Sequence, residues 1–210
     1  MDSKLSQAKL QARRWVWFLD VVFGAIVALG IQTYEPTIKA AWQLGALETV
    51  LSLVVAIAAA FFVVYDIVVY HLLVRKYRYT VSSIGFIRFF LDLVMAFILY
   101  TLLVSALQAN PDWYAMLWSL TLWHAAATVW HLLAQAELSE PSDDNTLAES
   151  VGSHVVFILI YWAVAFVSYG FAQQEMASLE LSPDSVALTS LSISILAVSA
   201  LRWHRVLVKL

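Results

Sequence analysis

Seven ionisable side chains lie inside long apolar stretches of this sequence, where a charge is costly unless it finds a partner. They comprise three aspartates, three histidines and one arginine: Asp20, Asp66, Asp92, His71, His124, His131 and Arg88. At such a depth, carboxylates and imidazoles can carry a proton or a cation, or they can hold helices together through hydrogen bonds. For Asp66 the sequence leaves both interpretations open, because no basic residue lies one helical turn away.

The spacing of these residues suggests partners for some of them. Arg88 and Asp92 are four residues apart, so they can pair on one face of a helix. Asp20 must find its partner on another helix, and His71 is expected at the same depth. We therefore predict a hydrogen-bonded cluster of Asp20 and His71, with Tyr70 beside them, that clips two helices together.

The histidines do not have the spacing of a metal site. His124 and His131 are seven residues apart, which is about 10.5 Å along a helix, too far for one metal ion with bonds of about 2 Å to bridge. His154 and His204 lie in two further apolar stretches but do not repeat this spacing. We therefore expect no metal site and no haem or other cofactor.

The motifs of common enzymes are also missing from the sequence. It contains no cysteine, which removes disulfides, thiolate ligands and cysteine nucleophiles. It has no phosphate-binding glycine loop, zinc-protease motif, dinucleotide fingerprint or nucleophile elbow. No nucleophile stands out beside a base, so we expect no enzymatic activity.

The composition is that of a membrane protein. The chain has 210 residues, of which 62% are hydrophobic and 13% charged, and its mean hydropathy is +0.78. A soluble domain is roughly 45–50% apolar and about 25% charged. These values exclude a soluble globular enzyme and a disordered chain, and a net charge of −3 argues against nucleic acid as a partner. We predict an all-α integral membrane protein surrounded by the lipid bilayer.

Six stretches are long and apolar enough to cross about 30 Å of hydrocarbon as helices, and none alternates as a barrel strand would. They cover about residues 15–32, 50–73, 84–107, 113–133, 151–171 and 186–208. Glu35-Pro36 is expected to end the first span, and residues 35–47 to form either a short interfacial helix or an ordered loop. Asp112 can cap the fourth span. The chain, 1–210, is therefore predicted as a single six-helix transmembrane domain.

The basic residues set the expected orientation. All Lys and Arg residues except Lys39 fall on one side of a six-span arrangement, and the positive-inside rule then puts both termini in the cytoplasm. Residues 137–149 contain five acidic residues and no Lys or Arg. We interpret this segment as a flexible cytoplasmic loop, either a plain connector or a partner-binding element.

The first span carries a short pattern that resembles the signature of the transmembrane protein 175 family, the lysosomal potassium channels and their prokaryotic relatives. The residues that match are Arg14, Phe18, Asp20, Val22 and Phe23. Leu19 stands where the family has serine, and the aromatic residues and His71 of the second span are similar to that family's second helix. The resemblance is specific over about ten residues and architectural elsewhere.

This resemblance implies a homotetramer in which the first helix of each subunit lines a central pore for a monovalent cation. It also implies a location in a prokaryotic inner membrane. In the family, bulky aliphatic side chains on the first helix form the constriction, and the signature residues belong to a polar network that holds this helix. Transferred to this chain, Arg14, Phe18, Asp20 and His71 would be structural.

The positions that would line such a pore follow from helical spacing. One stripe contains Ala25, Ala28 and Gln32, which are small or polar where the family is bulky. If the helix is rotated, Ile26 and Leu29 would supply aliphatic rings instead. Small residues on one face also suit close packing between helices, so both roles stay open for this stripe.

Our leading hypothesis from the sequence is an oligomeric cation channel, for potassium, whose hydrophobic constriction gates by excluding water. The first alternative is a proton- or ion-coupled transporter that uses the intramembrane carboxylates Asp66 and Asp92, together with Asp20. The second is a non-conducting membrane scaffold or a subunit of a larger complex.

Overall fold

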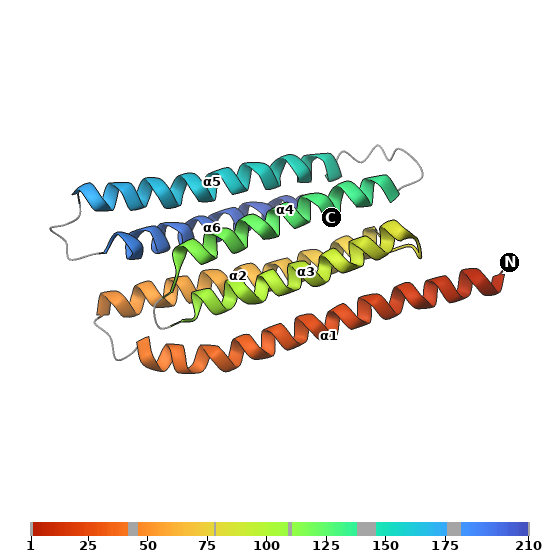
Figure 1. The fold of residues 1–210 in the computed structure, drawn as a ribbon, viewed down its shortest axis with the longest axis horizontal. Helices are drawn as coiled ribbons and strands as arrows, with labels where there is room; N and C mark the ends of the chain where they lie inside the picture. Colours follow the sequence, from red (N-terminus) through yellow and green to blue (C-terminus); the bar gives the residue numbers. More distant parts are fainter. Residues whose placement is uncertain are drawn as a thin grey trace.

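Six helices make up the fold, which confirms the predicted all-α class. The computed structural model describes residues 2–41, 46–77, 79–108, 111–137, 146–175 and 182–209. Its helices are α1 (Asp2–Ala41), α2 (Ala46–Lys76), α3 (Ser83–Ala106), α4 (Trp113–Glu137), α5 (Thr146–Glu175) and α6 (Pro183–Lys209). Figure 1 shows them side by side and nearly parallel to one axis, with the amino terminus and the connection between α2 and α3 at the same end.

Five of the six helices contain segments long and apolar enough to cross a membrane. These segments are Leu10–Tyr34, Thr49–Val74, Ser83–Ala106, Val151–Gln174 and Pro183–Trp203. They are compatible with a multi-pass integral membrane protein. The expected span 113–133 is not among them: helix α4, which contains it, has two histidines, His124 and His131, within its apolar stretch.

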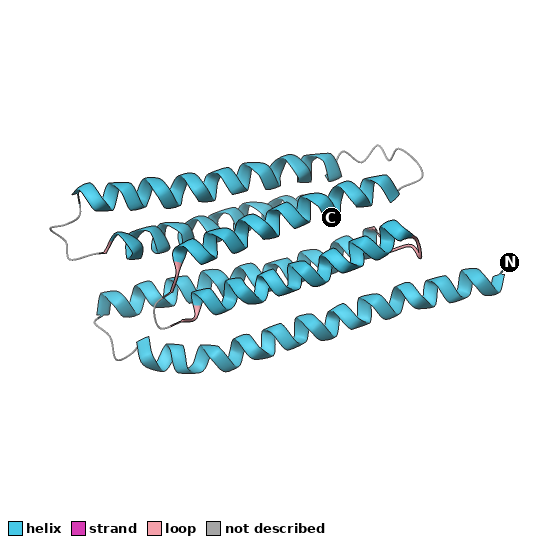
Figure 2. Ribbon diagram, viewed as in Figure 1, coloured by secondary structure: helices cyan, strands magenta, loops and turns pink. Residues whose placement is uncertain are grey.

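Helices α2 to α6 form a closed ring of neighbours. Each packs against the next along the chain, α6 packs back against α2, and α4 also touches α6 across the middle. Helix α1 lies outside this ring, at the edge of the bundle in Figure 2, and its contacts within the described part of the chain are with α2 and α3. Any group buried between α2, α3, α4 and α6 is therefore enclosed by protein.

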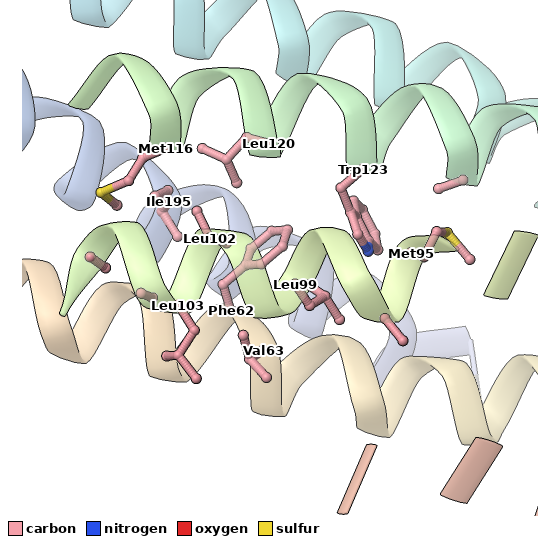
Figure 3. Packing of buried hydrophobic residues seen from close by; sticks show 14 of the residues in the cluster. Phe62, Val63, Met95, Leu99, Leu102, Leu103, Met116, Leu120, Trp123 and Ile195 are labelled. Carbon is pink, nitrogen blue, oxygen red and sulfur yellow. The ribbon is translucent and has the colours of Figure 1, made fainter. Parts of the chain in front are cut away.

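The middle of the bundle is filled with buried aliphatic and aromatic side chains, as Figure 3 shows. Phe62 of α2 meets Trp123 of α4 edge to face, with ring centroids 5.2 Å apart. On the outside the pattern is reversed, since Phe97 is 71% exposed and Val167 70% exposed. Hydrocarbon solvates such side chains well, so the exposed apolar surface agrees with a membrane setting.

Polar side chains fix the beginnings of three helices. Ser82 accepts a hydrogen bond from the backbone N–H of Gly85 (2.9 Å) at the start of α3. Asp112 caps α4 in the same way, as predicted, by accepting from two backbone N–H groups, and Ser182 accepts from Ser185 at the start of α6 (3.1 Å). Each cap satisfies donors that have no partner within the helix.

Glu35-Pro36 follows the end of the first apolar span, as predicted, since the segment long and apolar enough to cross a membrane is Leu10–Tyr34, but the helix does not stop there. Helix α1 continues through Pro36 to Ala41, so residues 35–41 form neither a separate interfacial helix nor a loop. Proline removes one backbone hydrogen bond, and a helix that is otherwise intact tolerates this loss near its end. Residues 42–45 lie outside the described part of the chain.

The acidic segment 137–149 is also shorter than predicted. Glu137 is the last residue of α4, and residues 146–149 already belong to α5. Only 138–145 separate the two helices, and these lie outside the described residues. As the last residue of α4, Glu137 is placed to bind residues at one end of the bundle.

Candidate functional site

A small cavity lies between the helices, with walls from α1, α2, α3, α4 and α6. Its volume of about 30 Å³ is enough for one or two water molecules. Apolar side chains such as Phe23 and Met95 form part of the wall. The polar residues that line it are Asp66, Tyr70, Asp92, Trp130, His131 and Arg202. These polar residues come from four helices and include Asp66 and Asp92, two of the aspartates singled out in the sequence.

Asp66 shares this cavity with a cation. It is only 6% exposed, and Arg202 of α6 lines the same space. The Arg202 guanidinium lies 5.5 Å from the ring centroids of Tyr65 and Trp123, and its Nη1 has no hydrogen-bond partner among the described residues. Tyr70, one turn beyond Asp66, has its hydroxyl 3.4 Å from that of Tyr79. The cavity is therefore lined by both a buried carboxylate and an arginine whose Nη1 makes no hydrogen bond to the described residues.

Asp92 is fully buried on α3 and is held by two donors. Its Oδ2 accepts hydrogen bonds from the Tyr79 hydroxyl and from Nε1 of Trp130, the latter at 3.1 Å. Its Oδ1 has no partner in the described part of the chain. One oxygen is thus fixed by protein while the other is left for a water molecule or a proton.

Arg88 pairs with Glu137 of α4, and not with Asp92 as the spacing on α3 predicted. Its Nη2 also donates to the carbonyl of Tyr77 (2.7 Å), and the guanidinium lies 4.4 Å from the ring centroid of Trp130. The charge of Arg88 is therefore balanced by a carboxylate from another helix, and Asp92 takes its hydrogen bonds from neutral donors instead.

Glu137 joins α4 to the connection between α2 and α3. Its Oε1 accepts hydrogen bonds from the backbone N–H of Thr80 (3.3 Å) and the hydroxyl of Ser82 (3.0 Å). Burial alone would raise the pKa of Glu137, but hydrogen bonds from Thr80 and Arg88 outweigh it and hold this pKa below its usual range. The carboxylate therefore stays ionised and closes this end of the bundle.

Three histidines lie in or beside the cavity, and their contacts with one another were not predicted from the sequence. His124 and His154, from α4 and α5, have their Nδ1 atoms 2.8 Å apart. The rings of His131 and His154 have centroids 5.1 Å apart. Among the described residues no group of three His, Asp or Glu side chains is placed to hold a metal ion, and the side chain of His204 is not described.

The expected contact between Asp20 and His71 is present, with 2.9 Å between Oδ1 and Nε2. The Nδ1 of His71 lies 2.7 Å from the carbonyl of Ile67, so both bonds form together only when both ring nitrogens carry a proton. Arg14 and Phe18 are exposed. Of the predicted network, the structure therefore brings together Asp20 and His71, which join α1 to α2.

The candidate pore-lining residues of α1 divide into two groups. Ala25, Ala28, Leu29 and Gln32 are exposed in the protomer. Ile26 is 6% exposed and belongs to the hydrophobic core. The first four residues therefore lie on a side of α1 that the described helices leave uncovered, since their contacts with α1 come from α2 and α3.

Comparison of the chain with protein-family models, curated proteins and solved structures finds no match. The resemblance to the transmembrane protein 175 family therefore rests on the sequence pattern of the first two spans and the expected architecture. Within the described residues, the cavity brings carboxylate, imidazole and guanidinium groups together, and it is therefore the candidate functional site.

Proposed function

We propose that this chain is a multi-pass membrane protein that moves protons across the bilayer through the interior of its helix bundle, with Asp66 as the carboxylate that is loaded and unloaded. The observation that carries the proposal is the polar cavity between apolar helices, which contains Asp66, Asp92, His131 and Arg202. Ionisable groups at membrane depth are expensive and mark pathways for protons and ions.

The lining of the cavity favours a proton over other cargoes. A metal cation would have to lie beside the Arg202 guanidinium, and the two positive charges would repel strongly at this low dielectric constant. A proton bound to a carboxylate becomes part of a neutral acid and avoids this repulsion. An organic solute needs a pocket of roughly 300 Å³ or more, and this cavity is about 30 Å³.

In this proposal α4 is the sixth span. It connects the end of α3 to the beginning of α5 and packs against both, so it crosses the same slab as its two neighbours. Its polar side chains Ser119, His124 and His131 are buried, which keeps them out of the lipid. The distribution of Lys and Arg then favours cytoplasmic termini, and the family resemblance favours a prokaryotic inner membrane.

Proton flux into liposomes that contain the purified protein and an internal pH dye tests the proposal. Under an imposed membrane potential, Asp66→Asn should lower the flux at least about a hundredfold, as expected for loss of an essential proton carrier. Asp20→Asn is the matched control, since Asp20 is a half-exposed carboxylate outside the cavity. Wild-type flux no higher than that of empty liposomes, or full flux in Asp66→Asn, would contradict the proposal.

A second candidate function is the oligomeric potassium channel lined by α1. The observation that favours it is the uncovered side of α1, where Ala25, Ala28, Leu29 and Gln32 are exposed. Around a shared axis these residues would face the ion path, and Leu29 is the one bulky enough to form a constriction that excludes water. In this assembly Ile26 supports the helix from inside the protomer.

Potassium currents in planar bilayers separate the two functions. For a channel, Leu29→Asn should change the conductance and Asp66→Asn should leave it intact, while Val167→Asn, an exposed position on α5, should have no effect. Equal currents from wild type and Leu29→Asn would exclude this pore. A monomeric protein with neither currents nor proton flux would favour the scaffold interpretation.

A further inference from the structure

The three buried histidines beside the cavity form a row that the proposed function does not use. His131 lines the cavity, His154 lies next to it on α5, and His124 follows two turns earlier on α4. Their exposed fractions are 4%, 1% and 0%. Three titratable rings are thus buried in contact with one another, and their hydrogen bonds indicate which ring nitrogens can accept a proton.

The first ring in the row can receive a proton from the cavity. Nδ1 of His131 lies 2.7 Å from the backbone carbonyl of Ala127. A carbonyl oxygen only accepts, so Nδ1 must donate and carries the hydrogen. The neutral ring therefore has a bare Nε2, which is a proton acceptor on a residue that lines the polar space.

The second and third rings share a hydrogen bond that can pass a proton. Between the Nδ1 atoms of His124 and His154, 2.8 Å apart, one nitrogen donates and the other accepts, so the two neutral rings are opposite tautomers. The Nε2 atoms of both rings have no partner among the described residues. Each ring of the pair therefore uses its Nδ1 for the shared hydrogen bond and has an Nε2 that can exchange a proton.

The first and second rings lie side by side, with centroids 5.1 Å apart. No direct hydrogen bond joins them in the described structure, so a water molecule between their Nε2 atoms would complete this step. Beyond His124 lies Tyr161, with ring centroids 5.6 Å apart and a hydroxyl that has no partner in the described structure. Polar groups therefore continue from the cavity along α4 for about 10 Å, the rise of seven helical residues.

We propose that His131, His154 and His124 form a proton relay that connects the cavity with the half of the bundle that contains the start of α4. A proton that reaches Nε2 of His154 makes it an imidazolium, which releases its Nδ1 hydrogen to Nδ1 of His124. His124 then releases the hydrogen on its own Nε2, so one proton leaves for each that enters. The transfer exchanges the tautomers of the pair, and they are restored when each ring passes a hydrogen between its own two nitrogens through water.

Arg202 keeps the proton from resting in this row. Its guanidinium lies 5.5 Å from the centroid of Trp123 and 5.7 Å from that of Phe157, and each of these rings contacts a histidine of the relay. A nearby positive charge disfavours a second one on an imidazole ring. The relay therefore rests in its neutral form, which is the state in which it can accept the next proton.

This inference rests on the proposed proton flux, and the test separates the two. In the same liposome assay, His154→Gln keeps a hydrogen-bonding side chain but removes the titratable ring, and it should lower the flux about a hundredfold, the lower end of the range for positioned proton-transfer groups. His71→Gln is the matched control, because His71 lies outside the row. An Asp66→Asn variant that is inactive beside a fully active His154→Gln would overturn the relay and leave the proposed function standing.

Two further measurements distinguish a relay from a purely structural contact. Added imidazole should restore part of the flux of His154→Ala, whereas a merely structural role predicts no dependence on imidazole. In the wild-type protein, nitrogen NMR of labelled histidine should find one Nδ1-protonated and one Nε2-protonated ring in the pair. Two rings both protonated on Nε2, which cannot form the bond between Nδ1 atoms, would overturn the proposal whatever the variants do.

Discussion

Arg88 and Glu137 form an ion pair that joins the second turn of α3 to the last residue of α4. Both side chains are enclosed, with 1% and 7% of their surface exposed. The same guanidinium binds the carbonyl of Tyr77 and packs on Trp130. One pair of charges therefore holds together two helices and the connection between α2 and α3, at the end of the bundle where the cavity lies.

Glu137→Gln should destabilise the protein by about 3 kcal/mol, because loss of one partner leaves the buried charge of Arg88 uncompensated. The free energy of unfolding in detergent, measured by titration with a denaturing detergent, checks this. Asp20→Asn is the control: its pair with His71 is about 40% exposed, and such pairs contribute at most about 1 kcal/mol. Equal losses of unfolding free energy in the two variants would contradict the larger contribution assigned to the Arg88–Glu137 pair.

The same carboxylate predicts how stability depends on pH. The pKa of Glu137 is lowered from 4.5 in the folded protein, so its contribution is complete above the unfolded pKa and is lost as the pH falls through the folded one. Between about pH 6 and about pH 3, the thermal midpoint of the wild type should fall more than that of Glu137→Gln. A larger fall in the variant would reverse the sign and refute the prediction.

Gly85 lies where a side chain has no room. A Cβ at this position would be 2.0 Å from the backbone oxygen of Thr80 and 3.0 Å from Oε1 of Glu137. Gly85→Ala should therefore cost about 3 kcal/mol, the upper range for overpacking. Gly24→Ala, with nothing within 4 Å of its Cβ, should instead stabilise α1 by about 0.5–1 kcal/mol. Thermal unfolding in detergent tests this: the thermal midpoint should fall in Gly85→Ala and rise in Gly24→Ala.

Tyr79→Phe should cost about 1.5 kcal/mol, because it removes a hydrogen bond to the buried carboxylate of Asp92. Denaturation in detergent measures the loss. Tyr100→Phe, which alters a partly buried tyrosine at the other end of α3, provides the control and should change stability by less than about 0.5 kcal/mol. A neutral Tyr79→Phe would mean that Trp130 alone satisfies Asp92.

Much of the fold follows from the sequence, because apolar runs of about 20 residues and capping residues such as Asp112 act locally. There are two exceptions. Pro36 follows the end of the apolar span, as predicted, but the helix continues past it, because the removal of one hydrogen bond does not break a helix that is otherwise continuous. Glu137 was assigned to an acidic loop because its neighbours in the sequence are acidic, although its own partners lie on α3 and before it.

The contacts of the site could be predicted only in part. The depth of Asp20 and His71 on the first two helices correctly indicated that they meet. The partner of Arg88 and the neighbour of His124 lie on other helices, and one sequence contains no signal for rotation of a helix about its axis. Helical spacing selects pairs within a helix, so it favoured Asp92 over Glu137 and gave no reason to join His124 to His154.

The order in which the helices pack has a consequence for how the protein is made. Because α6 borders α2, the carboxylate of Asp66 meets its cationic neighbour Arg202 only after α6 has been synthesised. In a membrane, a nascent chain that stops before α6 would leave this acid without a compensating charge, which is an expensive state. Assembly of the bundle around Asp66 therefore waits for α6, although α2 is made much earlier.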